Sequence, residues 1–454
     1  MSQQQVQPRP HQTRELAPSV LAAAHSLRRG FEGAVHLPGE ADYDARRRAP
    51  YSSVDPHPAL VAEAASVADV RAAVVTARDY DLPFAVQATG HGTHVPSDGG
   101  LLLRTSGMSS VLVDPERRIA RVRPGTVWEE VIADAEPFGL APLAGTAPSV
   151  GVVGYTLGGG FGWLARKYGF AADSVLCAEI VTADGRIVTA SPDRHADLFW
   201  AVRGGGGNFG VVTSLEFRLH PVAQVHAGTA FFAIDRAAET LVRYRDWIRD
   251  VPDELSTAIL LTRLPHDPEV PEALRGRRVI GIQAMYPGEA EQARRLLRPL
   301  WAAAGPVLLD GMRSTTFGRS AMGGTFPRRM ETLHTLPDPV IEALVNAGGR
   351  AAPTVEIRHW GGAIAGQGPG AAPVGHRDVP LSVIVDVDVP EVDQALRTHG
   401  TGGTFLNFLH DTTRTATAYA ADDHRRLREV KRAYDPDNFF RHNHNIPPAG
   451  LGSG

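Results

Sequence analysis

Three glycine-rich turns, each beside a predicted strand, hold the residues with the clearest chemical potential. They are Thr89-Gly90-His91-Gly92, Gly158 to Gly162, and Gly204 to Gly210. Glycine lets the backbone approach a ligand closely and point successive N–H groups at one anion, as phosphate recognition requires. None of the turns fits the G-x-G-x-x-G dinucleotide fingerprint or a Walker loop. Together they favour a phosphate-bearing ligand over three unrelated tight turns.

Length and composition describe a globular, slightly acidic protein. The 454 residues suffice for two or three domains at about 150 residues each. With 43% hydrophobic and 21% charged residues, disordered, collagen-like and coiled-coil classes fit poorly. Acidic residues exceed basic ones by 50 to 46, for a formal charge of -4. Because no dense basic run is present, we expect no nucleic-acid partner, and we interpret the basic helix predicted at 422–434 as a solvated face.

Cysteine, histidine and apolar patterning restrict the chemistry further. Cys177 is the only cysteine, which excludes an internal disulfide and a Cys-based zinc or iron–sulfur site. His442 and His444 are two residues apart with no carboxylate beside them, so no metal site is expected there. No apolar run is long enough for a membrane span, and no signal-peptide pattern is present. We therefore expect a cytoplasmic protein with no membrane partner.

Capping signals and apolar segments alternate along the chain. Ser66 with Asp69, and Thr126 with Glu129, are predicted capping boxes that each open a helix. From about residue 225 the glycine clusters cease, and strands and helices alternate, which predicts a second domain. The predicted strands are 83–87, 101–103, 120–122, 178–182, 186–189, 210–219, 227–234, 256–262, 278–285, 355–360 and 381–387, and further predicted helices are 16–27, 289–297 and 422–434.

Long, specific segments between Pro83 and Pro221 carry a family resemblance. They include Thr156 to Gly162 and Asp197 to Thr213, and near the C-terminus Asn407-Phe408 and Tyr434 to Phe440. These segments resemble the FAD-binding domain and the C-terminal segment of berberine-bridge-enzyme-like oxidases. The resemblance covers roughly residues 50–448.

The resemblance implies an α+β architecture. A two-subdomain FAD-binding domain of the vanillyl-alcohol-oxidase type is expected, together with an α+β substrate domain that contains an antiparallel sheet. The expected boundaries are an N-terminal tail and helix at 1–45, the FAD-binding domain at 46–224, the substrate domain at 225–400, and a C-terminal segment at 401–454 that returns to the FAD-binding domain.

The resemblance also implies FAD bound covalently through His91. A neutral imidazole is available as a nucleophile at physiological pH. Many family members carry a second flavin bond through a cysteine, which falls at Ala147 here, so only one link is expected; the pattern is similar to singly linked, hydroxynicotine-oxidase-like members. Cys177 lies in an apolar stretch and is expected to be a small buried hydrophobe. The implied FAD contacts are Gln87, Ala88, Thr89, Gly90, His91, Gly92, Thr93, Thr146, Ala147, Val150, Gly151, Gly154, Tyr155, Gly158, Gly159, Gly162, Val211, Val212 and Asn407.

The identity of the catalytic base is the main departure from the family pattern. Alcohol-oxidising relatives tend to show Tyr-x-Asn-Tyr where this chain has Phe405 and Phe408, and phenylalanine cannot take a proton. Tyr155, where relatives often have histidine, either hydrogen-bonds the flavin or caps a pocket, and it is our catalytic candidate. His410 and His359 are alternatives, as is a substrate that is an amine or is itself acidic.

The leading hypothesis is an FAD-dependent oxidase that takes a hydride from a carbon bearing oxygen or nitrogen. Its partners would be a small organic substrate, by family habit a natural-product intermediate, and molecular oxygen, which is reduced to hydrogen peroxide. By resemblance, Val150 lies where oxygen access is controlled, and its modest bulk suits an oxidase. The alternatives are a flavin dehydrogenase with another acceptor, and a non-redox cyclase or scaffold that retains FAD.

Overall fold

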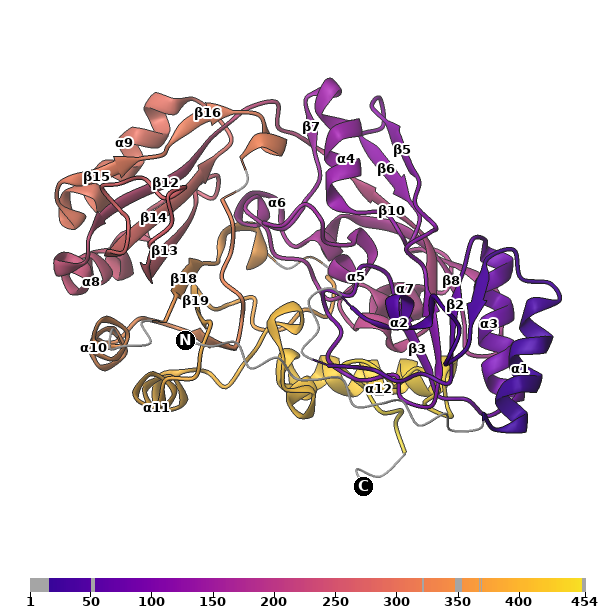
Figure 1. The fold of residues 1–454 in the computed structure, drawn as a ribbon. Coiled ribbons are helices and arrows are strands. Elements are labelled where there is room, and N and C mark those ends of the chain that lie inside the picture. The colour runs from indigo at the N-terminus through magenta and orange to yellow at the C-terminus, as the bar shows by residue number, and fades with distance from the viewer. Residues whose placement is uncertain are drawn as a thin grey trace.

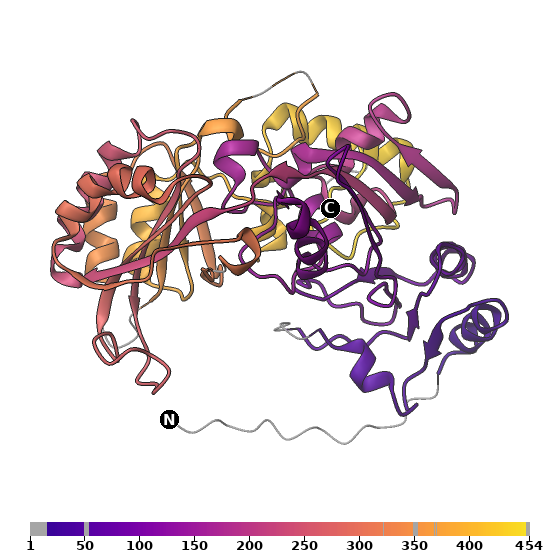
Figure 2. The ribbon, with the colours of Figure 1, turned by 90° about the horizontal axis from the view of Figure 1, so that it is seen from above.

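The described chain divides into two halves that lie side by side (Figures 1 and 2). One half contains the strands between residues 34 and 221, and the other contains those between 225 and 385. The domain boundaries at 46, 225 and 401 stay a prediction, and part of the expected N-terminal tail lies outside the described residues. The computed structural model describes residues 16–49, 54–320, 322–347, 353–366, 368 and 370–450.

A four-stranded mixed sheet begins the first half. Its elements are α1 (Pro18–Arg28), β1 (Ala34–His36), α2 (Tyr43–Arg47), β2 (Leu60–Glu63), α3 (Val67–Asp79), β3 (Phe84–Gln87) and β4 (Leu101–Arg104). The order is β1-β2-β4-β3, with β4 parallel to β2 and β3. The predicted capping box of α3 is confirmed, since the Ser66 hydroxyl accepts from the Asp69 N–H and the Asp69 carboxylate accepts from the Ser66 N–H.

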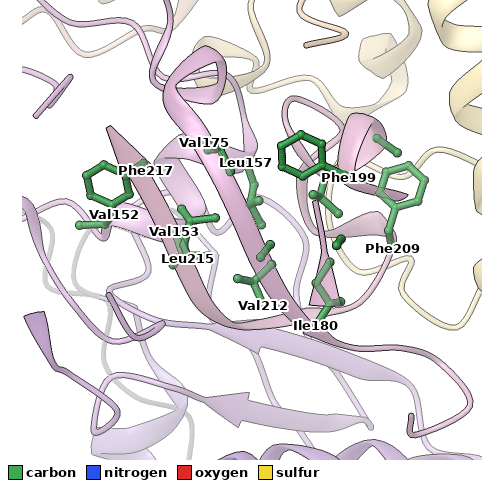
Figure 3. Close-up of a cluster of buried hydrophobic side chains, with 14 of the residues drawn as sticks. Val152, Val153, Leu157, Val175, Ile180, Phe199, Phe209, Val212, Leu215 and Phe217 are labelled. Carbon is green, nitrogen blue, oxygen red and sulfur yellow. The ribbon is translucent and has the colours of Figure 1, made fainter. Parts of the chain in front are cut away.

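A five-stranded antiparallel sheet completes the first half. Its elements are β5 (Val111–Asp114), β6 (Ile119–Val122), α4 (Trp128–Ala135), α5 (Val152–Leu157), β8 (Val175–Val181), β9 (Ile187–Ala190), α7 (Ala196–Val202) and β10 (Val211–Arg218), with the short pair β7 (Leu140–Ala141) and β11 (His220–Pro221). The order is β5-β6-β10-β8-β9. Figure 3 shows Val152 and Leu157 of α5 in one apolar cluster with Leu215 and Phe217 of β10. This packing holds α5 in place against the sheet.

Helix α4 begins one residue later than its sequence predicts. The expected N-cap, Thr126, instead exchanges hydrogen bonds with the backbone of Ser110: its hydroxyl donates to the carbonyl at 3.0 Å and accepts from the N–H at 3.2 Å. Val127 is the N-cap, and its N–H donates to the Glu130 carboxylate at 2.8 Å. The prediction of a Thr126–Glu129 box is wrong because the threonine hydroxyl bonds the backbone of Ser110, the residue before β5, instead of the first turn of the helix.

The second half is built on a larger antiparallel sheet. Its strands are β12 (Val225–Ala233), β13 (Ser256–Arg263), β14 (Arg278–Tyr286), β15 (Val307–Asp310), β16 (Arg313–Thr315), β17 (Arg329–Leu333), β18 (Val355–His359) and β19 (Leu381–Val385), and its helices are α8 (Ala237–Trp247), α9 (Ala290–Ala304), α10 (Asp338–Asn346) and α11 (Pro390–His399). The order is β15-β12-β14-β13-β18-β19-β17, and β16 pairs with β12. The predicted α+β fold with an antiparallel sheet is confirmed.

The two faces of this sheet differ in what covers them. Ile259, Ile282 and Ile357 on one face pack with residues of the helices in a single apolar cluster. Helix α9 was predicted to end at residue 297 but continues through Pro299 to Ala304, because its buried side chains keep the later turn on the sheet. The opposite face is directed at the first half, where two further clusters combine residues of both halves.

The C-terminal segment returns to the first half through helix α12 (Ala421–Tyr434), which lies beneath that half in Figure 1. Within it Lys431 is fully buried, which corrects the interpretation of this helix as wholly solvated. Its ammonium donates to the Asn208 carbonyl and the Asp435 carboxylate, each at 2.7 Å, and to the Phe440 carbonyl at 2.9 Å. The bond to Asn208 attaches the segment to the third glycine turn, and the other two lie within the segment.

Candidate active site

The first glycine turn follows β3 and packs against the start of α5. Gly90 has a φ of +85°, and a Cβ at this position would lie 2.6 Å from the Cβ of Ala49, so the turn requires glycine. A Cβ on Gly151, the N-cap of α5, would lie 3.5 Å from the Thr89 side chain. The first turn and the start of α5 therefore form one continuous wall.

His91 lies in this wall as a half-buried side chain. Its Nδ1 is 2.8 Å from the hydroxyl oxygen of Thr89. Burial lowers the pKa of His91 below the usual histidine value. The imidazole is therefore neutral at pH 7, and a neutral ring keeps a nitrogen lone pair that can attack an electrophilic carbon.

A cavity of about 100 Å³ adjoins the first turn and is lined by residues that follow β3 and by residues 442–444. Four of its buried polar atoms have no hydrogen-bond partner among the described residues: Nε2 of Gln87, Oγ of Ser97, Nε2 of His442 and Oδ1 of Asn443. Buried polar groups in native proteins are almost always paired. The cavity thus suits a polar ligand, whereas no group of three or more His, Cys, Asp or Glu in the described chain is placed to hold a metal.

The second glycine turn is held by the amide of Asn407, which lies in the short 3-10 helix Leu406–Phe408. Its Oδ1 accepts from the Gly160 N–H at 2.9 Å, and its Nδ2 donates to the Tyr155 carbonyl at 3.1 Å. A Cβ on Gly158 would lie 2.4 Å from that same Nδ2. The C-terminal segment therefore shapes the turn, and the turn fixes the position of Tyr155.

Tyr155 presents a buried hydroxyl with no hydrogen-bond partner in the described chain. Its ring packs edge-on against Trp128, with the ring centroids 5.5 Å apart. Burial raises the pKa of Tyr155 well above its usual value, and the nearby Arg358 opposes this effect. The side chain is therefore a neutral phenol at pH 7, able to donate a hydrogen bond to a ligand or to accept one.

A buried polar group on the large sheet lies near this tyrosine. Gln283 on β14 and Arg358 on β18 are both aligned with Ala258 of the intervening strand, so they share one face. Glu356 and Arg358 form an ion pair and are 0% and 5% exposed. The second carboxylate oxygen of Glu356 accepts from the Thr325 N–H at 3.0 Å.

Two aromatic rings from the second turn cover the Arg358 guanidinium. Its carbon lies 5.1 Å from the centroid of Phe161 and 5.2 Å from that of Trp163. Such stacking is favourable for a desolvated cation. Arg358 is therefore held between the sheet and the glycine turn, in the interface between the two halves.

The third glycine turn is joined to the C-terminal segment. The side chain of Asn208 donates to the carbonyls of Gly205 and His444 at 2.8 and 2.9 Å and accepts from the Ile446 N–H at 2.9 Å. Asn208 is fully buried. These contacts fix the position of the turn, and its predicted part in phosphate binding stays a prediction.

Comparisons with known proteins agree with this site. Residues 58–191 match the FAD binding domain family, and residues 404–447 match the family described as berberine and berberine like. The (R)-6-hydroxynicotine oxidase of Paenarthrobacter nicotinovorans is 28% identical over 463 residues, which cover 92% of this chain and 98% of that protein. The chain resembles the berberine-bridge-enzyme-like FAD-linked oxidases over most of its length.

Solved structures show the same fold. The crystal structure of 6-hydroxy-D-nicotine oxidase from Arthrobacter nicotinovorans aligns with a TM-score of 0.79 at 27% identity and covers 92% of this chain and 98% of that one. The berberine-bridge-enzyme-like protein 1 of Physcomitrella patens aligns with a TM-score of 0.80 at 21% identity, covering 95% and 100%. The fold of this chain is the vanillyl-alcohol-oxidase type, and its cofactor is FAD. No helix among the described residues is long and apolar enough to cross a membrane.

The residues of this berberine-bridge-enzyme-like chain fit FAD. The unpaired Nε2 of Gln87 and the unpaired hydroxyl of Tyr155 are orphaned buried groups that a polar cofactor would satisfy. Gly159 and Gly160 have φ values of +111° and +76°, and a Cβ on either would collide with neighbouring atoms. Gly151, the N-cap of α5, is buried beside the Thr89 side chain of the first turn.

Several other predicted contacts have clear positions in the structure. Val211 and Val212 are 3% exposed and belong to apolar clusters, and their contact with FAD stays a prediction. Ala147 lies on an exposed loop and has no thiol. Cys177 on β8 was expected to be a buried core residue but is only half-buried. This partial burial raises the pKa of its thiol. The other sequence-predicted contacts lie in or beside the first two turns in the sequence, except Asn407, which bonds to the second turn. They are residues 87–93, 146–147, 150–151, 154–155, 158–159, 162 and 407.

The two histidines named as alternative bases lie in different surroundings. His359 belongs to β18, but its position on the strand alternates with Arg358, so it lies on the opposite face. Its Nε2 is 2.9 Å from the Arg166 guanidinium, and burial holds the pKa of His359 well below its usual value. The His410 ring is tilted against that of His94, with ring centroids 4.6 Å apart. Phe405 is 1% exposed and stacks on Phe170 at 5.3 Å.

Proposed function

We propose that this protein is an oxidase that removes a hydride from a carbon bearing oxygen or nitrogen in a small organic substrate. FAD, when bound, accepts the hydride and passes the electrons to molecular oxygen, which yields hydrogen peroxide. The observation that carries the proposal is the buried, unpartnered hydroxyl of Tyr155 opposite the polar face of the large sheet. A substrate between them would be screened from water.

We further propose a single covalent attachment of FAD through His91. The neutral, half-buried imidazole, whose Nδ1 lies 2.8 Å from the Thr89 hydroxyl oxygen, supports it, as does the absence of a thiol at Ala147. The remaining predicted contacts position the cofactor: the Gln87 amide, the backbone of the two turns and the Asn407 amide. Val150, whose carbonyl accepts from the Trp128 N–H at 3.1 Å, lies beside Gly151, and we propose that its side chain controls oxygen access.

In the proposed reaction, the chain binds, orients and dehydrates the substrate. Tyr155 donates or accepts one hydrogen bond at the reacting oxygen or nitrogen. Because Tyr155 is neutral at pH 7, it is not already a base. A neutral phenol cannot take up a proton, so Tyr155 orients the reacting oxygen or nitrogen through its hydrogen bond, and the proton is lost to solvent from an amine or acidic substrate.

The experiment is anaerobic mixing of the flavoprotein with a panel of alcohols and amines. Bleaching of the flavin absorbance, followed by peroxide formation when oxygen is admitted, supports an oxidase. Bleaching that persists in air but reverses with a quinone indicates a dehydrogenase. An absence of bleaching throughout the panel, with product formed from a substrate, indicates the non-redox alternative and contradicts the proposal.

A further inference from the structure

Arg358 differs from the other buried arginines in the use of its donors. The Arg166 guanidinium is equally buried and donates to the carbonyls of Leu255, Pro252 and Trp360. Arg377 donates to both oxygens of Asp173 as well as to backbone carbonyls. Among the described residues, Arg358 forms an ion pair with Glu356, and its buried Nε has no hydrogen-bond partner. A guanidinium offers five N–H donors, so within the described chain several Arg358 donors remain available for a ligand.

Other unpaired atoms lie around it. The indole N–H of Trp163, whose ring covers the guanidinium, has no partner within the described chain, and neither does the hydroxyl of Tyr155. The unpaired acceptor on the same sheet face is Oε1 of Gln283, because its amide nitrogen already donates to the Met322 carbonyl at 2.8 Å. Donors therefore exceed acceptors, and an acceptor-rich ligand group would satisfy them.

The surroundings of this group are apolar and aromatic. Phe161, Phe170, Trp360 and Phe405 form one buried cluster on one side. Trp163 and Met285 belong to a second cluster on the other side, against which Tyr155 packs. Clusters of this kind accommodate a flat hydrocarbon body, while a few placed polar groups fix its orientation.

We propose that Arg358 is the anchor for a carboxylate on the substrate, which would be a small organic acid with a flat, apolar body. This inference rests on the proposed function, because it names the substrate class of that same site. Glu356 acts as a positioning residue: it holds one side of the guanidinium through the ion pair and is itself held by Thr325. The remaining donors of Arg358 then bind the carboxylate, which also accepts from the indole N–H of Trp163, while the Tyr155 hydroxyl stays at the reacting atom.

The test measures binding of benzoate to the oxidised flavoprotein, with benzamide as a neutral ligand of the same shape. Dissociation constants come from the perturbation of flavin absorbance and from calorimetry. No oxidation is required, so failure of the oxidase proposal would leave this result readable. We expect benzoate to bind at least ten times more tightly than benzamide, since hydrogen bonds to charged groups are the stronger ones.

Two variants and one control complete the test. Arg358→Gln should weaken benzoate binding at least tenfold and abolish the preference over benzamide. Trp163→Phe keeps an aromatic ring but removes the indole N–H donor, so it should weaken benzoate binding several-fold. This variant tests the proposal if Arg358→Gln does not fold. Arg117→Gln, at a side chain that is 69% exposed, should change neither. Equal affinity for the two ligands, no benzoate binding, or unchanged benzoate affinity in a folded Arg358 or Trp163 variant would overturn the proposal.

Discussion

The side-chain amide of Asn407 donates to the backbone carbonyl of Tyr155 at 3.1 Å, which joins two residues that are 252 positions apart in the chain. The same amide accepts from Gly160. The C-terminal segment therefore builds part of the active site, and it does so through backbone groups of the second turn.

Asn407→Leu keeps the side-chain volume and removes both hydrogen bonds. Because two buried backbone groups lose their partner, we expect the free energy of unfolding to fall by about 1–3 kcal/mol and the flavin content to fall with it. Asn407→Asp keeps the acceptor for the Gly160 N–H, so its free energy of unfolding and its flavin content should fall less than in Asn407→Leu. Denaturant titration and the ratio of flavin to protein absorbance measure both effects, with exposed Gln394→Ala as the control. Unchanged stability in Asn407→Leu would show that the amide does not hold the turn.

Tyr155→Phe removes one hydroxyl and keeps the packing against Trp128. The hydroxyl orients the reacting atom, and a small misplacement of reacting atoms can cost on the order of 10²-fold, so we expect anaerobic flavin reduction to slow about a hundredfold with substrate binding unchanged. Because burial raises the pKa of Tyr155, the reduction rate should show no ionisation of this phenol between about pH 6 and 9. A rate within about threefold of the parent in stopped-flow measurements would eliminate Tyr155 and leave an amine or self-acidic substrate.

A cluster of histidines predicts how stability depends on pH. Burial, with smaller effects from His444 and His410, lowers the pKa of His94 to about 4. Between about pH 6.5 and 4, the unfolded chain binds a proton at His94 that the folded chain does not, so stability falls as the pH is lowered through that window. His94→Gln should reduce the fall by at most about 2–3 kcal/mol over the window. Urea unfolding midpoints measured across this pH range give the fall in stability, with exposed His25→Gln as the control. An equal dependence of the midpoint on pH in both variants would contradict the role of His94.

Local signals predicted the local parts of the site. The Ser66 cap, the strand ending at Gln87 and the turn that carries His91 all follow from short sequence patterns, and each forms in the structure. The fold class followed from the family resemblance, which long motifs support. Asn407 was expected in the site from that same resemblance, although its two backbone partners were not foreseen.

Long-range packing explains why the burial of three charged side chains could not be predicted from the sequence. Strand β18 reads Val-Glu-Ile-Arg-His, and such alternation ordinarily places the polar residues in water. Glu356 and Arg358 are instead buried, because that face packs against the other half of the molecule. Lys431 lies in a basic amphipathic helix and is buried for a similar reason, namely its bonds to Asn208 and Asp435. Burial of this kind depends on partners hundreds of residues away.

His91→Ala should fold and retain FAD without the covalent bond. Gln87, the two turns and Asn407 supply contacts that do not depend on the imidazole. We expect the flavin to leave this variant completely on denaturation, and substrate oxidation to be slower, because alkylation of the ring withdraws electron density. If the variant reduces its flavin as fast as the parent at saturating substrate, the covalent bond only anchors the cofactor.

The central claim is an FAD-linked oxidase with its flavin attached at His91 alone, and peptide mapping of acid-precipitated protein tests it most directly. The account predicts that the washed precipitate stays yellow and that one tryptic peptide, the one containing His91, carries the flavin mass. Complete release of free FAD into the acid supernatant, or a flavin found on any other peptide, would contradict it.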